Sequence, residues 1–533
     1  MKRPLLLLAT LLALAACGGG EDAVPTPETP ADTPVPDATT PSPETATPSP
    51  ATPTPTPRAG PPAPCTGPEP PLADAPDWPH PNYDAGGSRA TFTSAITSDN
   101  VKSLEVAWSY ELPSGGAFGI IATTPIVSGG VVYVGDLQTN VHAIDFESGN
   151  RRWMVDVEQW TYGPSGVAVS GGCVFANLGG HSIVAYRAID GERLWSTNIL
   201  ADGGAVNFQP LVAGGTVFAA TSSLSQPAAR GALYALDPST GDIRWSFNTI
   251  LSEDVWGNPE INSGGGAWYP PALDLEAGVS YWGTSNPYPY PGVEGYPLGA
   301  SRPGDNRWTN SILAVDIATG ELRWGVQHIP HDIFDRDAVL TGIATLDDGA
   351  EVIISTGKLG RVFGLDPDGT VLWETPVGIH KNDDVTEFEG EIEVMPGNAG
   401  GVVTPIAIAE GVVYLVVVNA PTKYRPDVPE GVGTSLNVHP SQMVAIDARD
   451  GEVIWKTDLP GDAFGGATVV NDLVFTSVIT GVILALDRAT GEIVWGHQAA
   501  GGINGWPAVA GDTLLVPVGF GDPGFLLALR LPR

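Results

Sequence analysis

One pattern recurs along most of the chain, and it limits the possible folds more than any other feature. Each copy contains an apolar strand, an Asp/Gly turn and a second strand that closes on tryptophan, as a β-hairpin does. Two copies are "LYALDPSTGDIRW" and "ILALDRATGEIVW", and the copies end at Trp153, Trp195, Trp245, Trp324, Trp373, Trp455 and Trp495. A further strand such as "GGVVYVG" precedes most copies. Four short strands that recur about every 40 to 50 residues predict an all-β fold, the β-propeller.

The two ends of the repeat array supply the halves of one more unit. Near the start, "SLEVAWSYEL" carries Trp108 without a preceding strand, and the chain ends on "GFLLALRLPR", a strand without its turn and tryptophan. Pairing the two segments closes the ring and removes the exposed sheet edges. With the seven complete copies, this predicts an eight-bladed propeller over residues 65–533, in which the N- and C-terminal strands close one blade.

The first 64 residues have the composition of a targeting segment followed by a linker. Lys2 and Arg3 precede an apolar run that is too short to span a bilayer. The "LAAC" that ends at Cys17 resembles a bacterial lipoprotein cleavage box. We therefore expect residues 1–17 to be a lipoprotein signal peptide ending at a lipidated Cys17; the alternative is an ordinary signal peptide with an incidental cysteine. The Pro/Thr-rich residues 18–64 predict a disordered linker, so the propeller would be an exported envelope protein held at the membrane by its lipid anchor only.

Charge and cysteine content exclude some partners and groups. The net charge of −35, from 60 acidic and 25 basic residues, argues against nucleic acid and anionic membrane surfaces as partners. Export permits a disulfide between Cys65 and Cys173, but their separation in the sequence leaves the pairing open. No Cys-x-x-Cys-His sequence occurs, so no c-type haem is expected on this chain.

The repeat A-x-D-x-x-[ST]-G-x-x-x-W resembles the docking repeat of the pyrroloquinoline quinone (PQQ) dehydrogenase propellers, over about residues 75–533. Outer-membrane assembly scaffolds share this repeat without a cofactor. The insertion "GGGAWYPPALDLEAGVSYWGTSNPYPYPG" and the later "VQHIPHDIFDRDAV" are similar to the active-site stretch of quinoprotein alcohol dehydrogenases, which is more specific. The resemblance implies oxidation of a small-molecule or polymeric alcohol, with electrons passed to a separate acceptor such as a cytochrome c.

Four residues match the family's site by position. The resemblance implies that Trp268 stacks on the flat quinone, that Asn286 binds the metal, that Asp335 is the catalytic base and a metal ligand, and that Lys358 lies against the quinone oxygens. The residue types suit these roles: an aromatic floor holds a planar ring, oxygen donors hold a hard cation, and a carboxylate accepts the hydroxyl proton. Taken singly, each has an ordinary structural explanation, such as packing or a polar turn.

Other positions depart from the family pattern. Gln226 stands where the family has a metal-binding glutamate, and its carbonyl can still bind a cation. Ser222, Ser223 and Gln226 of this loop are expected to bind the cofactor. The stretch "WTYGPSGVAV" replaces the family's adjacent cysteine pair, and its Ser165 stands where an arginine would meet the quinone carboxylates.

The third aspartate of the active-site stretch adds a carboxylate. Asp337, two residues after Asp335, resembles the extra metal ligand of the lanthanide-dependent methanol dehydrogenases and would restore the charge missing at Gln226. We expect Ca²⁺ as the metal, with a lanthanide as the alternative. Asp332 is expected to support the turn and His331 to have a structural role.

Two functions from different classes follow. The joint presence of Trp268, Asn286, Asp335 and Lys358 favours a PQQ-dependent oxidoreductase acting on CH–OH groups. The missing glutamate and arginine favour the alternative, a non-catalytic propeller that acts as a binding scaffold at the cell surface.

Overall fold

The computed structural model describes Cys65 and residues 77–113, 115–116, 118–200, 203–223, 225–432, 436, 438–521 and 523–533. The expected signal peptide with Cys17, and the linker 18–64, lie outside the described residues. Within the described ranges, no helix has the length and apolar character needed to cross a membrane. Only two short 3₁₀ turns, η1 (Val101–Ser103) and η2 (Val255–Gly257), are helical there.

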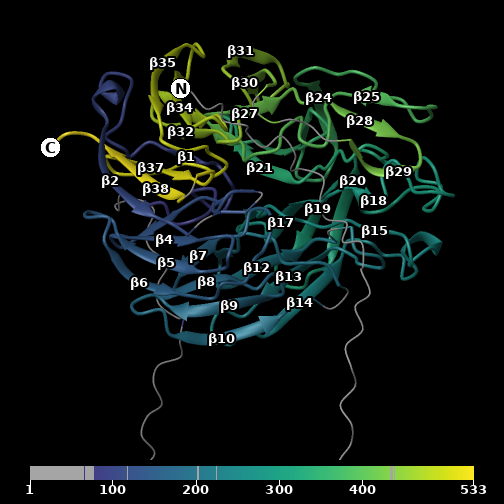
Figure 1. The fold of residues 1–533 in the computed structure, drawn as a ribbon, viewed down its shortest axis with the longest axis horizontal. Coiled ribbons are helices and arrows are strands. Elements are labelled where there is room, and N and C mark those ends of the chain that lie inside the picture. The colour runs from purple at the N-terminus through teal and green to yellow at the C-terminus, as the bar shows by residue number, and fades with distance from the viewer. Residues whose placement is uncertain are drawn as a thin grey trace, which may run out of the picture. The chain divides into compact units, whose positions relative to one another are not determined.

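The described residues form eight four-stranded antiparallel blades, as the repeat predicts (Figure 1). Blade 1 consists of β3 (Ile126–Ser128), β4 (Val131–Gly135), β5 (Val141–Asp145) and β6 (Arg151–Val155), and blade 2 of β7 (Val167–Ser170), β8 (Cys173–Leu178), β9 (Ser182–Arg187) and β10 (Arg193–Asn198). Blade 3 consists of β11 (Leu211–Ala213), β12 (Thr216–Thr221), β13 (Ala232–Leu236) and β14 (Ile243–Asn248), and blade 4 of β16 (Ala272–Asp274), β17 (Val279–Gly283), β19 (Ser311–Asp316) and β20 (Leu322–Gln327). Blade 5 consists of β21 (Leu340–Thr345), β22 (Glu351–Thr356), β23 (Arg361–Leu365) and β24 (Val371–Pro376), and blade 6 of β26 (Ala407–Ala409), β27 (Val412–Val418), β30 (Ser441–Asp447) and β31 (Val453–Leu459). Blade 7 consists of β32 (Thr468–Val470), β33 (Leu473–Ser477), β34 (Val482–Asp487) and β35 (Ile493–Gln498), and blade 8 of β36 (Ala508–Ala510), β37 (Thr513–Val518), β38 (Phe525–Arg530) and β2 (Glu105–Glu111).

The eighth blade closes the ring with strands from both ends of the propeller. β2 pairs antiparallel with β38, with Trp108 opposite Ala528, and Figure 1 shows the purple β2 beside the yellow β38. The predicted pairing of the N- and C-terminal strands is confirmed. It gives the last strand a partner on each side, because β38 also pairs with β37.

Seven of the repeated tryptophans each join their blade to the next one. Trp373 at the end of blade 5 donates its indole N–H to the carbonyl of Ala448 in blade 6, at 3.0 Å. Six more blade-to-blade bonds of this kind are made by Trp108, Trp153, Trp195, Trp245, Trp324 and Trp455. The repeat's glycine lies under the indole: Gly451 has φ +77°, and a Cβ there would lie 2.5 Å from Trp373 Cε3. The Gly and the Trp of the repeat are therefore two halves of one contact.

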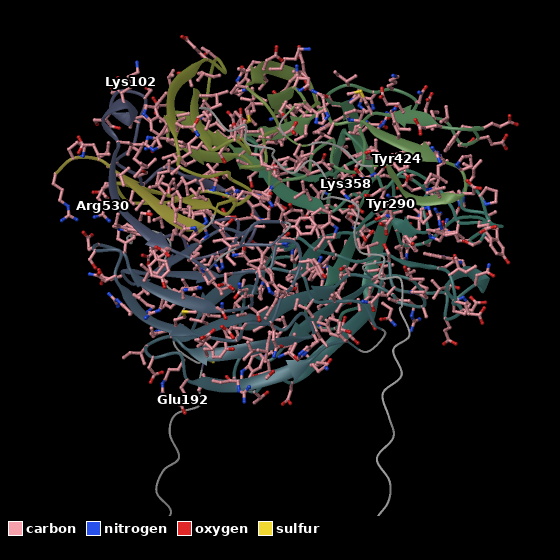
Figure 2. All side chains as sticks on the ribbon, viewed as in Figure 1. Lys102, Glu192, Tyr290, Lys358, Tyr424 and Arg530 are labelled. Carbon is pink, nitrogen blue, oxygen red and sulfur yellow. A yellow bond between two sulfur atoms is a disulfide. The ribbon has the colours of Figure 1, made fainter. Side chains whose placement is uncertain are left out.

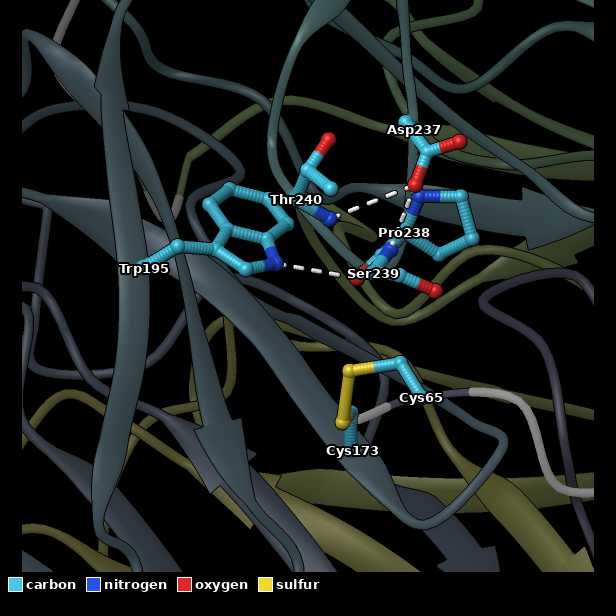
Figure 3. Close-up of a disulfide and its surroundings, with 7 residues drawn as sticks. All are labelled: Cys65, Cys173, Trp195, Asp237, Pro238, Ser239 and Thr240. Carbon is cyan, nitrogen blue, oxygen red and sulfur yellow. Dashed lines mark hydrogen bonds between the residues drawn. A yellow bond between two sulfur atoms is a disulfide. The ribbon is translucent and has the colours of Figure 1, made fainter. Parts of the chain in front are cut away.

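The N-terminal segment before β2 ties the blades together. Its backbone carbonyls at Ala85, Gly86, Ser88 and Arg89 accept hydrogen bonds from the first strands of blades 4, 5, 6 and 7, and its residues 90–91 form β1 (Ala90–Thr91), which adds to blade 7 in parallel. Farther back, Cys65 forms a disulfide with Cys173 in β8 (Figure 3). The disulfide that the sequence left open is thus present and fastens this end to blade 2.

Two small sheets interrupt the regular blades. β15 (Ser263–Gly264) pairs with β18 (Pro287–Tyr288), and β28 (Thr422–Arg425) pairs with both β25 (Ile392–Val394) and β29 (Val428–Val432). Both lie in the longest intervals between repeat tryptophans. The first of them brings Tyr288 of the blade 4 insertion to the site described next.

Candidate active site

A rigid turn carries the three aspartates of the active-site stretch. The buried Asp332 accepts hydrogen bonds from Asn310 Nδ2, the backbone N–H of Phe334, and both the backbone N–H and Nε of Arg336, at 2.7 to 3.0 Å. Burial opposes its ionisation, but Arg336 and the backbone N–H groups hold the pKa of Asp332 below its ordinary value. Asp332 therefore supports the turn, as expected.

Asp335 sits in this turn with a left-handed backbone. Its φ of +61° is unusual for a residue with a side chain and is held by the bonds around Asp332. His331 at the start of the turn lies with Nδ1 3.0 Å from the carbonyl oxygen of Gly304. It lines no part of the cavity described below.

One ammonium group joins two of the aspartates. Lys358 Nζ, from the turn between β22 and β23, lies 3.0 Å from Asp335 Oδ2 and 2.8 Å from Asp337 Oδ2. The other oxygen of Asp337 accepts the backbone N–H of Asn286 at 2.8 Å. Four residues predicted from three separate stretches of sequence are therefore joined in one network.

The charges of this network do not balance. Two buried carboxylates share one ammonium, so the group carries an excess negative charge. Burial raises the pKa of Asp335 well above its ordinary value; Asp337 adds to this rise and Lys358 opposes it. Burial alone would lower the pKa of Lys358, but the two carboxylates raise it above its ordinary value. The network can therefore take up a proton or a further cation more readily than isolated aspartates could.

The network borders a cavity of about 280 Å³. Trp268, Ser222, Ser223, Asn286, Asp335, Asp337 and Lys358 all line it. Lys358 Nζ lies 5.6 Å from the centroid of the Trp268 ring, so the cation and the aromatic face are adjacent. Figure 2 marks Lys358 and Tyr290 in this region of the propeller, and Tyr290 also lines the cavity.

Two predicted positions lie outside this cavity. Gln226 is exposed, and its side-chain carbonyl accepts the backbone N–H of Gly204 at 3.3 Å. Ser165 is buried and accepts a hydrogen bond from Asn177 Nδ2. The structure therefore places neither Gln226 nor Ser165 in the cavity that Asp335 lines. The expected contacts of Gln226 with metal and cofactor stay predictions, and Ser165, which stands where the family has an arginine, makes no contact there.

Several lining residues were missed by reasoning from the sequence. Tyr162, Gly163 and Pro164 line the cavity from the stretch that replaces the cysteine pair, and Phe118 lies beside Tyr162 with ring centroids 6.4 Å apart. Tyr288 and Tyr290 line it from the insertion. The alternating "NPYPYPG" was a usable signal for these two tyrosines, since prolines fix the backbone that presents them.

The donors of the site suit a flat ring and one hard cation. Asp335 and Asp337 supply carboxylate oxygens and Asn286 an amide oxygen, which are ligands for Ca²⁺ or a lanthanide. Within the described residues, no three or more His, Cys, Asp or Glu side chains lie together in an arrangement that could hold a metal ion. Trp268 offers the face of a large aromatic ring. Among the described residues that line the cavity, Lys358 is the one cation. A quinone with several carboxylates would therefore meet this lysine here but not the arginine that the family has at the position of Ser165.

Two family models match parts of the chain. The model described as "Glucose/ethanol/alcohol dehydrogenase, beta-propeller domain" matches residues 201–376, which include Trp268, Asn286, Asp335 and Lys358. The model described as "Outer membrane protein assembly factor BamB" matches residues 99–255 and 439–519. The enzyme model therefore covers the part of the chain that supplies the carboxylate and lysine network.

Curated relatives with moderate identity are dehydrogenases. The quinohemoprotein alcohol dehydrogenase of Comamonas testosteroni is 29% identical over 328 residues, covering 55% of this chain and 45% of that protein. The 1-butanol dehydrogenase (cytochrome c) of Thauera butanivorans is 31% identical over 324 residues, covering 54% of this chain and 46% of that protein. The matched part of the chain thus spans about half the length of these relatives.

Solved structures show the same fold. The quinohemoprotein alcohol dehydrogenase from Comamonas testosteroni has a TM-score of 0.74 at 23% identity, covering 86% of this chain and 82% of its own. A europium-containing methanol dehydrogenase has a TM-score of 0.73 at 21% identity, covering 86% and 99%. The chain therefore has the β-propeller fold of these structures, and over the matched parts its sequence is similar to PQQ-dependent alcohol dehydrogenases.

Proposed function

We propose that the protein is a PQQ-dependent oxidoreductase that oxidises an alcohol group and passes the electrons to a separate acceptor, such as a cytochrome c. The observation that carries the proposal is the pair of buried carboxylates bridged by Lys358 beside the face of Trp268, in one cavity. The dehydrogenase family model that matches over this region and the alcohol dehydrogenases that are similar in sequence support it.

Each residue of the network has a role in this reaction. Asp335 accepts the hydroxyl proton of the alcohol, as a carboxylate that lines the cavity beside the aromatic face can do. PQQ, when bound, supplies the acceptor for the hydride that leaves the carbon. Trp268 would hold the flat ring, and Lys358 would stabilise negative charge that develops on its oxygens. Asp337 and Asn286, with Asp335, would hold Ca²⁺ or a lanthanide.

Reconstitution tests the proposal directly. Purified protein is mixed with PQQ and either Ca²⁺ or La³⁺, and cofactor uptake is followed by absorbance after removal of free PQQ. Dye reduction with an alcohol is then measured. We expect uptake in wild type, and in Asp335→Asn we expect uptake with dye reduction lowered at least about 100-fold.

The matched control is Asp190→Asn, which alters an exposed aspartate paired with Arg187 far along the sequence in blade 2. This variant should reduce the dye as wild type does. Equal dye reduction by Asp335→Asn and wild type would contradict the assigned base.

A second function is favoured by specific observations. Gln226 is exposed and Ser165 is occupied with Asn177, so two family contacts to metal and cofactor are not formed by these side chains. The BamB model also matches outside the insertion. A non-catalytic scaffold at the cell surface would explain both, and it becomes the better description if neither metal promotes PQQ uptake.

We also propose that the protein is exported and anchored by a lipid on Cys17. The Cys65–Cys173 disulfide supports an oxidising compartment. Expression of wild type and Cys17→Ser in a bacterial host tests this: wild type should fractionate with membranes and the variant should not. Equal membrane association of the two proteins would contradict a lipid anchor.

A further inference from the structure

One histidine contacts the turn that carries the lysine of the site. His380 follows β24 in the chain and is half-buried. Its Nε2 lies 3.0 Å from the carbonyl oxygen of Gly360. Gly360 is the last residue before β23, in the turn over residues 357–360 that presents Lys358 to the two carboxylates. The ring of His380 therefore touches this lysine turn directly.

The other nitrogen of the ring faces a carboxylate. His380 Nδ1 lies 2.7 Å from Asp383 Oδ2, and the Asp383 side chain is 9% exposed. The backbone carbonyl of Asp383 accepts a hydrogen bond from Nη1 of Arg336, which stands between Asp335 and Asp337 in the sequence. Through Asp383, His380 therefore connects the lysine turn to the aspartate turn.

The two contacts of the ring require two N–H donors. A neutral imidazole has one N–H and one nitrogen with a lone pair, so it can donate to one acceptor only. In a neutral ring, the lone pair would face either the Gly360 carbonyl oxygen or the Asp383 carboxylate, and both repel it. The geometry therefore fits a positively charged His380 that donates to both acceptors.

Charged groups face His380 from three elements: Asp383 on its own segment, Arg361 at the start of β23, and Arg336 beyond Asp383. The hydrogen bond to Asp383 raises the pKa of His380 above its ordinary value, whereas partial burial and Arg361 oppose the rise. Arg361 is itself paired with Glu374. Since an ordinary histidine titrates at about pH 6.5, this ring loses its proton on the alkaline side of that value.

We infer that protonated His380 is a positioning residue for Lys358: it fastens the lysine turn to the aspartate turn, and it releases the lysine turn when it loses its proton. The inference rests on the proposed function, in which Lys358 stabilises charge on the cofactor oxygens and Asp335 takes the hydroxyl proton.

The chemistry of the two acceptors decides which contact breaks. A hydrogen bond to a carboxylate is stronger than one to a neutral carbonyl, so the remaining proton stays on Nδ1 and faces Asp383. The contact between Nε2 and the Gly360 carbonyl is then lost. That carbonyl still accepts the backbone N–H of Val377 at 2.8 Å, so it is not left without a donor and the release can reverse.

Hydrogen exchange of the protein without added PQQ or metal tests the inference. The backbone N–H of Gly360 donates to the carbonyl of Gly357 at 3.1 Å and so reports on the lysine turn. Its exchange is followed by mass spectrometry over a pH series and divided by the exchange rate of an unstructured peptide at each pH. In wild type the corrected exchange should rise about tenfold as His380 loses its proton, the usual worth of one hydrogen bond from a charged group.

Two variants separate the proton from the shape of the side chain. His380→Gln can donate one hydrogen bond but has no proton to lose, so its exchange should show no step with pH. Asp383→Asn keeps an acceptor oxygen and removes the charge that holds the proton on His380, so its step should move to lower pH. Asp383→Asn also keeps the test usable if His380→Gln does not fold. The matched control is His497→Gln, at a half-buried histidine stacked on Trp495 in blade 7, which should keep the wild-type step.

Three exchange results would overturn the inference: no step in wild type, an unchanged step in His380→Gln, or a step in Asp383→Asn at the wild-type pH. Protein loaded with PQQ and metal gives a second readout, because kcat for dye reduction should fall over the pH range of the step in wild type but not in His380→Gln. A wild-type kcat that does not change over this range would show that His380 only stabilises the fold, and would also overturn the inference. Failure of the proposed function looks different: the exchange steps follow the expected pattern, while the loaded protein reduces no dye at any pH.

Discussion

Lys358 is the residue on which the charge of the site depends. Its ammonium is the shared partner of Asp335 and Asp337, and its side chain is only 16% exposed. Lys358→Met leaves two buried carboxylates facing each other without this cation. We expect the free energy of unfolding to fall by about 3–5 kcal/mol at neutral pH, the usual cost of removing one partner from a buried ion pair. Chemical denaturation of the metal-free protein measures it.

The stability loss in Lys358→Met should depend on pH in one direction. In the folded variant the carboxyl pKa values are raised, so folding is opposed at any pH at which these groups must be ionised. As the pH falls the carboxyl groups become protonated, and the loss of stability relative to wild type should therefore shrink. Lys358→Arg retains the positive charge and should lose less stability than Lys358→Met. A deficit of Lys358→Met that grows on acidification would contradict the assigned charges.

Asp337 should decide which metal the site prefers. Removing one carboxylate costs a trivalent ion more than a divalent one, since Coulomb attraction scales with the product of charges. In Asp337→Ala with PQQ present, La³⁺ affinity should therefore fall more than Ca²⁺ affinity, and calorimetric titration of both metals measures the ratio. Equal losses for the two ions would leave Ca²⁺ as the better assignment.

The sequence predicts those site residues that lie near rigid repeats or in the matched insertion. Trp268, Asn286, Asp335 and Lys358 belong to this class, and the structure places them around one cavity. The side-chain carbonyl of Gln226 accepts a hydrogen bond from the backbone N–H of Gly204. The position of Gln226 in its loop could not reveal that bond.

At the scale of the element, each blade contact needs a glycine under a tryptophan. Gly451→Ala places a methyl group 2.5 Å from Trp373 Cε3 and also strains a backbone with φ +77°. Gly349 has a similar φ of +82° with nothing within 4 Å, so Gly349→Ala isolates the backbone strain. We expect about 1 kcal/mol lost in Gly349→Ala and at least about 2 kcal/mol more in Gly451→Ala, from overpacking. Urea denaturation compares the two variants; equal losses would mean that the indole moves aside freely.

Element prediction succeeded where the hydrophobic pattern repeats and failed where it does not. Alternating strands with Asp/Gly turns specify the hairpins because the side chain of the turn aspartate bonds the following backbone, as Asp316 does with Ala318 and Thr319 at 2.9 to 3.0 Å. The pair β15 and β18 has two residues per strand, too short for any alternation to be visible. Its pairing is set by the insertion's packing rather than by its own sequence.

At the scale of the whole molecule, two devices hold the ring closed. The first, β2 on β38, was predictable because each half of the last blade lacks what the other has. The second, the segment before β2, was not, since its hydrogen bonds go to four different blades and leave no period in the sequence. Arg89 is the side chain through which this segment reaches the junction of blades 7, 8 and 1.

Arg89 is fully buried, and its guanidinium is bonded to the carbonyls of Pro81, Ala467 and Pro507 and to the side chains of Asn82, Thr124 and Thr468, at 2.8 to 3.3 Å. Arg89→Met removes a buried charge, which favours folding, but it also removes the donor to these six acceptors, which opposes folding. Because six acceptors lose a donor, the second effect should win, with a loss on the order of 3 kcal/mol. Thermal and urea denaturation measure the loss, and Arg449→Met, at an exposed arginine of blade 6, should change stability by less than about 1 kcal/mol. If Arg89→Met were more stable than wild type, the free-energy cost of burying the charge would exceed the stabilisation from its hydrogen bonds.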